Sequence, residues 1–184
     1  MTLNIKYMPA YSYREQHCMK MKASPEQAMN AILNYKTNDD CFFRCAIALR
    51  ELPYRIYKFF CKEKSKLAPF SLDHFTLLDI KDKQEVIFGL VGQLWKWNYG
   101  QVRITDRLSF LDFRQKNHVK LTLYFSIQKI DDVYVRVTTE TRVLCIDQTA
   151  LVKFRPYWHL IRPVSGWIRY RMLLQIQKNI FKSI

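Results

Sequence analysis

The spacing of hydrophobic positions changes twice along the chain, and these changes divide it into three regions. Ala28 and Ile32 lie four residues apart behind a Ser-Pro-Glu start, a combination that predicts a helix over residues 25–36. From residue 75 the spacing falls to two, which is typical of strands with one buried face. After Asp147, which can cap a helix, the helical spacing returns and continues to the end of the chain.

Alternation within the strand region indicates which side chains share a face of the sheet. The predicted strands cover residues 17–24, 75–80, 85–97, 118–130 and 133–145. In the last strand the valines point to one side, while Glu140 and Arg142 point to the other. Two interpretations of that second side are open. It is either the solvated outer surface of the sheet, or it carries an ion pair at the mouth of a cavity.

The order of the elements predicts an α+β architecture. A first strand is followed by two helices, the second of which begins after Asp40 and runs through residues 41–52. The remaining strands are joined by short polar turns, so we expect them to pair antiparallel, and they lead to one long terminal helix. A chain of 184 residues is long enough for one domain with its own core. We expect that domain over residues 17–184, preceded by an N-terminal extension over residues 1–16.

Two prolines shape the predicted course of the terminal helix. Pro156 and Pro163 each remove a helical hydrogen-bond donor, so we expect short segments before a long helix that begins at Val164. The apolar positions of this helix form two stripes. The first consists of Val164, Ile168, Met172, Ile176 and Ile180, and the second of Trp167, Tyr170, Leu174 and Phe181. Arg169 falls within the first stripe and needs a partner there, for which Glu140 is one candidate.

The tail of the chain carries a specific likeness to a known family. Its sequence TETRVLCIDQTALVKFRPYWHLIRPVSGWIRYRMLLQIQKNI resembles the SRPBCC superfamily, the START-like or polyketide-cyclase-like helix-grip proteins. The resemblance is closest to small bacterial members whose tail reads T-E-T-R-V and then F-R-x-Y-W-x-L-I-R-P-x-S-G-x-I-R. Here these motifs are Thr139 to Val143 and Phe154 to Arg169, with Pro156 where the family pattern prefers Arg. A weaker likeness through ASPEQAMNAI, ALRELP and EVIFGLVGQLW extends the match from about His17 to Ser183.

The resemblance implies a helix-grip fold, in which a curved antiparallel sheet wraps around the long C-terminal helix and leaves a cavity between them. Members of the superfamily bind lipids, sterols, polyketides and other apolar molecules, and a minority catalyse cyclisation or dehydration. We therefore expect an apolar or amphiphilic small molecule as a ligand that this chain binds without catalysis. The residues expected to line the cavity or to orient a polar ligand head are Phe88, Leu90, Trp95, Trp97, Leu123, Phe125, Glu140, Arg142, Trp158, Ile161, Ile168, Arg169 and Met172.

Composition narrows the classes of function. The net charge of +14 implies attraction to polyanions, and residues 148–184 hold seven Lys or Arg and no Asp or Glu. The five cysteines form no C-x-x-C pair, which argues against a disulfide framework and a structural zinc site. The sequence contains no G-x-S-x-G, H-E-x-x-H, G-x-G-x-x-G or P-loop motif, and its four histidines lie in unrelated contexts. We therefore expect no metal and no cofactor.

The terminal helix also decides which partners are expected. No apolar run reaches the ~20 residues that span a bilayer, and the start of the chain lacks the apolar segment of a secretory signal, which favours a cytoplasmic protein. The basic helix is either a buried grip, an interfacial face for an anionic membrane, or a nucleic-acid surface without a reading motif, which is the least favoured. Peripheral binding to an anionic membrane is thus the alternative to ligand binding. A cyclase or dehydratase with Glu140 or a histidine as base is a further alternative. The oligomeric state does not follow from the sequence.

Overall fold

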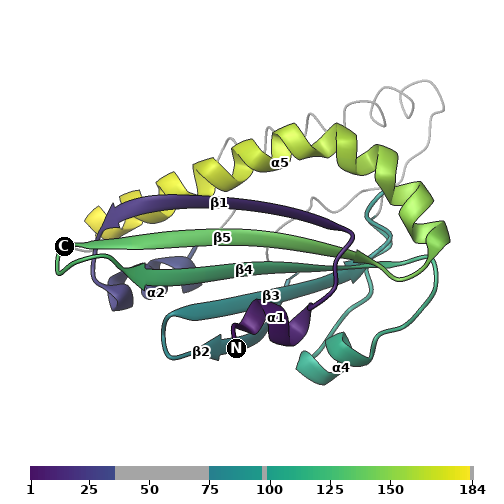
Figure 1. Ribbon diagram of the computed structural model, residues 1–184, viewed down its shortest axis with the longest axis horizontal. Helices are drawn as coiled ribbons and strands as arrows, with labels where there is room; N and C mark the ends of the chain where they lie inside the picture. The colour runs from purple at the N-terminus through teal and green to yellow at the C-terminus, as the bar shows by residue number, and fades with distance from the viewer. Residues whose placement is uncertain (36–74, 97–98, 183–184) are drawn as a thin grey trace, which may run out of the picture.

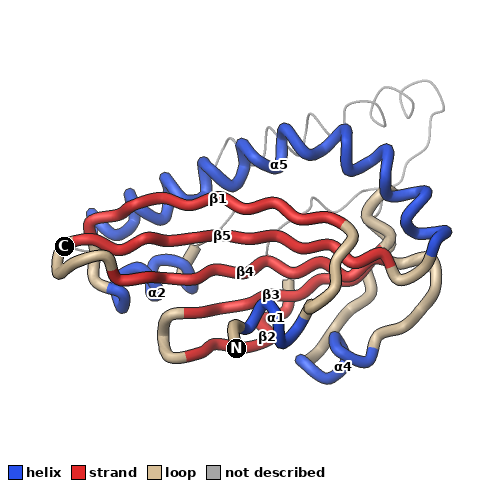
Figure 2. The backbone as a smooth tube through the Cα atoms, viewed as in Figure 1, coloured by secondary structure: helices blue, strands red, loops and turns tan. Residues whose placement is uncertain are grey.

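The computed structural model describes residues 1–35, 75–96 and 99–182 of the chain. Its elements in chain order are α1 (Leu3–Tyr7), β1 (Tyr13–Lys22), α2 (Pro25–Leu33), β2 (Thr76–Lys81), β3 (Glu85–Gly92), α4 (Arg107–Asp112), β4 (Val119–Lys129), β5 (Tyr134–Cys145) and α5 (Gln148–Lys182). The strands form an antiparallel sheet in the order β1-β5-β4-β3-β2, and α5 runs along its length (Figures 1 and 2). This is the predicted α+β, helix-grip architecture. The second predicted helix, residues 41–52, lies outside the described residues.

The register of the strands divides the sheet into two faces. Residues that pair directly across antiparallel strands point to the same side, and the side alternates along each strand. Thr139 and Thr141 of β5 pair with His17 and Glu15 of β1, so these four side chains share one face. Glu140 pairs with Gln16 and with Tyr124 of β4, and it therefore points to the other face.

Two apolar clusters fill the face that carries α5. The first, which we call the Met172 cluster, includes Met21, Ala28, Ile32, Val86, Leu123, Phe125, Val135, Val137, Met172, Leu173, Ile176 and Ile180. The second, the Trp158 cluster, includes Leu90, Leu94, Tyr99, Val119, Val143, Ala150, Phe154 and Trp158. The two clusters lie at opposite ends of α5. Each buries one end of the helix against the sheet, and this apolar burial is the main stabilising contribution of the interface.

A third apolar cluster covers the opposite face of the sheet. Leu3 and Tyr7 of α1 and Phe110 of α4 pack there on Ile87 and Tyr124, and all five residues are buried. Glu140 is therefore buried beside the part of this face that α1 and α4 cover, whereas Arg136 on the same side of β5 is exposed. We call this group the Phe110 cluster.

The N-terminal boundary differs from the prediction. Strand β1 begins at Tyr13, four residues before the expected domain start at His17, and its backbone pairs with β5 from its first residue. Residues 1–16 are also not separate from the core, since Leu3, Tyr7 and Met8 are at most 3% exposed. The five-residue helix α1 is too short for its hydrophobic spacing to be recognised in the sequence.

The predicted helix caps at Ser24 and Asp147 are confirmed. The Ser24 hydroxyl accepts a hydrogen bond from the Gln27 backbone N–H, and the Gln27 side chain accepts one from the Ser24 N–H, with Pro25 at the first helical position. At the start of α5, Asp147 Oδ1 accepts a hydrogen bond of 2.8 Å from the Ala150 N–H. Both helices begin where the sequence predicts.

The prediction that Pro156 and Pro163 divide the terminal helix is wrong. Helix α5 is continuous over 35 residues and contains both prolines. Each proline leaves one backbone carbonyl without its usual partner, and both are exposed, so water can satisfy these carbonyls. Pro156 and Pro163 lie seven residues apart, about two helical turns, and so share one exposed side of α5. There they are compatible with the bend of α5 over the sheet (Figure 1).

Candidate functional site

A polar layer separates the two apolar clusters beneath α5. It consists of Glu15 and His17 of β1, Thr139 and Thr141 of β5, and Arg169 of α5. The two threonines are 1% and 3% exposed. Polar side chains in the middle of an otherwise apolar interface are expensive unless their hydrogen bonds are made, so this layer needs an explanation.

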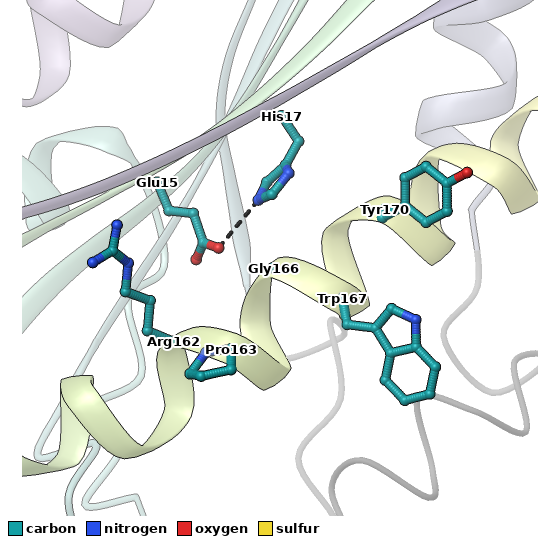
Figure 3. A pocket seen from close by; sticks show the side chains of 7 residues that line it. All are labelled: Glu15, His17, Arg162, Pro163, Gly166, Trp167 and Tyr170. Atoms are coloured by element: carbon teal, nitrogen blue, oxygen red, sulfur yellow. Dashed lines mark hydrogen bonds and ion pairs between the residues drawn. The ribbon is translucent and has the colours of Figure 1, made fainter.

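A cleft of about 680 Å³ opens beside this layer, between β1 and the middle of α5. It is lined by Glu15, His17, Arg162, Pro163, Gly166, Trp167 and Tyr170. Figure 3 shows Glu15 and His17 projecting from the strand on one side, and the helix residues on the other. The strand therefore contributes a carboxylate and an imidazole to the lining. The helix contributes a proline, a guanidinium group and two aromatic rings, of which Trp167 points away from β1 (Figure 3).

Glu15 and His17 are in hydrogen-bond contact at the cleft. His17 Nε2 lies 3.1 Å from Glu15 Oε1, and the two side chains come from positions i and i+2 of the same strand face. Gly166 leaves the room for this pair, because a Cβ atom there would lie 2.8 Å from Glu15 Oε1. A glycine in the interior of a helix is intrinsically unfavourable, and this close approach is a physical reason for its presence.

Several atoms of the polar layer are enclosed but have no hydrogen-bond partner. Among the described residues they are Glu15 Oε2, Thr139 Oγ1, Thr141 Oγ1 and Arg169 Nε. An enclosed polar atom without a partner is uncommon in folded proteins, and one explanation is a group supplied from outside the chain. Four such atoms in one layer point to a site for a water or a ligand.

Arg169 is the charged member of this layer that comes from the helix. The residue as a whole is partly exposed, but its Nε is enclosed. Burial lowers the pKa of Arg169 to about 10, and the negative charge of Glu15 acts in the opposite direction. The prediction that Arg169 lies within the sheet-facing stripe is therefore confirmed. Glu140 cannot be its partner, because Glu140 points to the other face of the sheet.

Most of the residues expected to line a cavity form the packed core instead. Leu123, Phe125 and Met172 belong to the Met172 cluster and are buried, with Phe88 packed against it. Leu90 and Trp158 are buried in the Trp158 cluster, and Trp95 packs on it. Ile161 and Ile168 are partly buried on α5, and Trp97 lies outside the described residues. None of the described members of this set lines the cleft.

Glu140 and Arg142 are brought together, but away from the cleft. Glu140 Oε1 accepts hydrogen bonds from Arg142 Nε at 2.7 Å and from Arg14 Nε at 2.8 Å. Burial alone would raise the pKa of Glu140, but the hydrogen bonds from the two arginines outweigh burial and lower it. Arg142 in turn donates to the carbonyl oxygens of Asn4 and Met8. This network fixes the N-terminal segment, and it does not reach the space between the sheet and α5.

An alternating pattern near the start of the chain marks the two strand residues that line the cleft. The segment YREQHCMK alternates, and it places Tyr13, Glu15, His17 and Met19 on one face of a strand. Two titratable residues in a row of core-facing positions are a departure from apolar alternation. That departure identifies Glu15 and His17 once the strand is placed at Tyr13, whereas the prediction began the strand at His17.

Of the four histidines, His17 is the one that lines the cleft. His118 is buried near Phe113, His159 is exposed on α5, and His74 lies outside the described residues. In the part of the chain that the structure describes, no three Cys, His, Asp or Glu side chains converge as metal ligands. None of the described helices is both long and apolar enough to cross a membrane.

Comparisons with known proteins give two structural likenesses. No family model matches the chain, and no curated protein matches it either. The crystal structure of a conserved protein from Geobacillus kaustophilus is 13% identical, with 93% of this chain and 97% of that chain covered and a TM-score of 0.46. A protein from Thermus thermophilus is 8% identical, with coverage of 93% and 99% and a TM-score of 0.36. At these values neither likeness carries an argument about function.

Proposed function

We propose that this chain is a helix-grip protein of the kind its tail motifs resemble, and that it binds an amphiphilic small molecule in the cleft between β1 and α5. The observation that carries the proposal is the mixed lining of the cleft, to which β1 contributes Glu15 and His17 and α5 contributes Trp167 and Tyr170. Pockets for small molecules combine an apolar surface with a few placed polar groups, and this cleft of about 680 Å³ has both, although it is wide open to solvent.

The geometry assigns a role to each wall. Trp167 and Tyr170 offer flat apolar surface to the hydrocarbon part of a ligand at the outer rim of the cleft, where Trp167 points away from β1 (Figure 3). Glu15 and His17 offer hydrogen bonds to its polar end. Because the Met172 and Trp158 clusters fill the space beneath α5 on either side, the ligand lies beside the helix instead of in a cavity deep under it.

Native mass spectrometry of protein purified from cells tests this proposal. We expect a copurified species of lipid-like mass with the wild-type chain, and its loss from Trp167→Ala. Phe181→Ala is the matched control, because Phe181 is an aromatic residue of α5 with 53% exposure against 56% for Trp167 and lies outside the cleft. A wild-type protein that carries no ligand and takes up no added amphiphile would contradict the proposal.

A second proposal is supported by the outer side of α5, which combines apolar and basic side chains. Val152, Leu160 and Trp167 are 63%, 76% and 56% exposed, and the neighbouring exposed charges are Lys153, Arg155 and Arg162. With no acidic residue in the whole helix, such a face is suited to the interface of an anionic bilayer. Since Arg162 and Trp167 also line the cleft, a docked membrane would lie against its mouth.

Cosedimentation with vesicles tests docking separately from ligand binding. We expect the protein to bind vesicles of phosphatidylcholine with phosphatidylglycerol but not vesicles of phosphatidylcholine alone. Binding should weaken as added salt shortens the Debye length, which is ~8 Å at physiological ionic strength. Leu160→Glu should abolish binding. Leu108→Glu is the control, because Leu108 is 61% exposed on α4, beside the Phe110 cluster on the other face. An equal loss of vesicle binding in Leu160→Glu and Leu108→Glu would contradict docking. Equal binding to charged and uncharged vesicles would contradict it as well.

A further inference from the structure

The enclosed atoms of the polar layer specify the kind of group that completes it. Glu15 Oε2 is an acceptor without a donor, and Arg169 Nε carries a hydrogen without an acceptor. Thr139 and Thr141 add two hydroxyls that can donate or accept. Any group that satisfies this layer must therefore supply at least one donor and one acceptor.

The charges of the layer balance each other. Glu15 contributes one negative charge and Arg169 one positive charge. Burial lowers the pKa of Arg169, and the negative charge of Glu15 offsets part of that effect. Arg162 is exposed at the cleft, so water screens its charge. An anion brought next to Glu15 Oε2, or a cation brought next to Arg169 Nε, would meet a like charge in a poorly solvated place.

We infer that the polar end of the ligand is an uncharged group with both a donor and an acceptor, a hydroxyl or a primary amide, which enters between Glu15 and Arg169 and is held by Thr139 and Thr141. This inference rests on the proposed function, since it uses the same cleft and names the class of its ligand. The net charge of +14 would by itself favour an anionic ligand, whereas the local arrangement of charges in the layer favours an uncharged one.

Glu15 links the polar layer to the cleft. Glu15 belongs to both, because its Oε1 faces His17 and Gly166 in the cleft while its Oε2 is enclosed. Thr141 is the direct cross-strand partner of Glu15, and Thr139 is that of His17. A polar group in the cleft therefore meets Glu15 and His17 first. It reaches the two hydroxyls of β5 only when the Glu15 carboxylate moves away from Gly166, because the gap between them does not admit a Cβ atom.

Matched probes with one alkyl chain test the inference. We propose calorimetric titration with octanol, octanamide, octanoate and octylamine, with the backbone amide signal of Gly166 in NMR spectra as the marker of binding in the cleft. We expect octanol and octanamide to bind at least about tenfold more tightly than the charged probes. Thr141→Val should lower the affinity for octanol by roughly three- to tenfold, which is the usual effect of losing one hydrogen bond. Thr122→Val is the control, because Thr122 is fully buried on the opposite face of the sheet.

The outcomes separate this inference from the proposed function. If no probe shifts the Gly166 signal, both fail. If octanoate binds in the cleft as tightly as octanol, the ligand site stands and the inference on its chemistry is overturned. It is also overturned if Thr139→Val and Thr141→Val leave octanol binding unchanged, because the hydroxyls would then hold water only.

Discussion

Glu140 and Arg142 lie two residues apart on β5 and form a direct ion pair, with 2.7 Å between Glu140 Oε1 and Arg142 Nε. The side chains of both are largely buried, at 7% and 11% exposure. The pair lies under the N-terminal segment, whose carbonyl oxygens at Asn4 and Met8 accept hydrogen bonds from the same arginine. It therefore joins the first residues of the chain to the centre of the sheet, on the face away from α5.

Removal of Glu140 should destabilise the protein strongly. Glu140→Ala leaves Arg142 buried without its counter-charge, and we expect a loss of about 3 kcal/mol in the free energy of unfolding, measured by urea denaturation. Arg14→Ala removes a partner whose side chain is 43% exposed and should cost less than about 1 kcal/mol. A loss below about 1 kcal/mol for Glu140→Ala would show that the pair is effectively solvated.

Deletion of residues 1–8 should also destabilise the domain. It exposes Ile87 and Tyr124, which α1 covers, and it removes the carbonyl acceptors of Arg142. Since each large apolar side chain contributes about 1.5–3 kcal/mol on full burial, the loss of Leu3, Tyr7 and Met8 should exceed about 3 kcal/mol. If the truncated protein has the same denaturation midpoint as the full chain, residues 1–8 are an extension that does not stabilise the domain.

Lys120 should make stability depend on pH above neutrality. Burial lowers its pKa from 10.5 to about 8 in the folded protein, beneath α4 where its Nζ donates to the Leu111 carbonyl. Between these values the unfolded chain binds more protons than the folded one, so the free energy of unfolding rises with pH. We expect a rise of about 2 kcal/mol from pH 8 to pH 10.

The variant Lys120→Met isolates this contribution, because it lacks the titrating amine. Burial also raises the pKa of Tyr124 to about 12 and that of Cys145, and these shifts act in the opposite direction as the pH rises. Both groups titrate in the wild type and in the variant alike. The difference between their stability curves should therefore show the Lys120 effect alone, and parallel curves would contradict it.

Replacement of Gly166 should affect binding more than stability. In Gly166→Ala the helix gains about 0.5–1 kcal/mol of intrinsic preference, but the new Cβ lies 2.8 Å from Glu15 Oε1 and pushes that carboxylate away. We expect the free energy of unfolding to change by less than about 1 kcal/mol and the affinity for octanol to fall about tenfold. Ser165→Ala, one residue away and outside the cleft lining, should change neither.

The two threonines of the polar layer should be unfavourable for stability in the absence of a ligand. Their hydroxyls are enclosed without partners, so Thr139→Val and Thr141→Val remove a desolvation penalty and keep the shape of the side chain. We expect each variant to be more stable by about 1 kcal/mol in thermal unfolding of the ligand-free protein. A clear loss of stability would show that ordered water already satisfies these hydroxyls.

Much of the fold could be predicted because it depends on local rules. The Ser24 and Asp147 caps use side-chain oxygens that bond within three residues, so their positions are visible in sequence. The alternation of β4 and β5 fixes which residues face α5 once one buried face is assumed. The prolines of α5 predict a break that does not occur. Both lie on an exposed side of the helix, where water can bond to the carbonyl groups that they leave unpaired.

The candidate site could not be predicted in the same way. It depends on Glu15 and His17 of β1 meeting Gly166 and Arg169 of α5, about 150 positions later in the chain, and no local spacing encodes that distance. Most of the apolar residues expected to line a cavity are packed against one another in the Met172 and Trp158 clusters under α5, so they leave no space for a ligand there.

The sequence by itself determined the order of the five strands, α2 and α5, the caps of these two helices, and the side of β4 and β5 that packs on α5, because these follow from hydrogen bonds and periodicities within a few residues. The tertiary structure alone decided that the first eight residues cover the Glu140 face and that the polar layer opens at the edge of β1. Both depend on which distant surfaces meet, and burial, not local spacing, selects those surfaces.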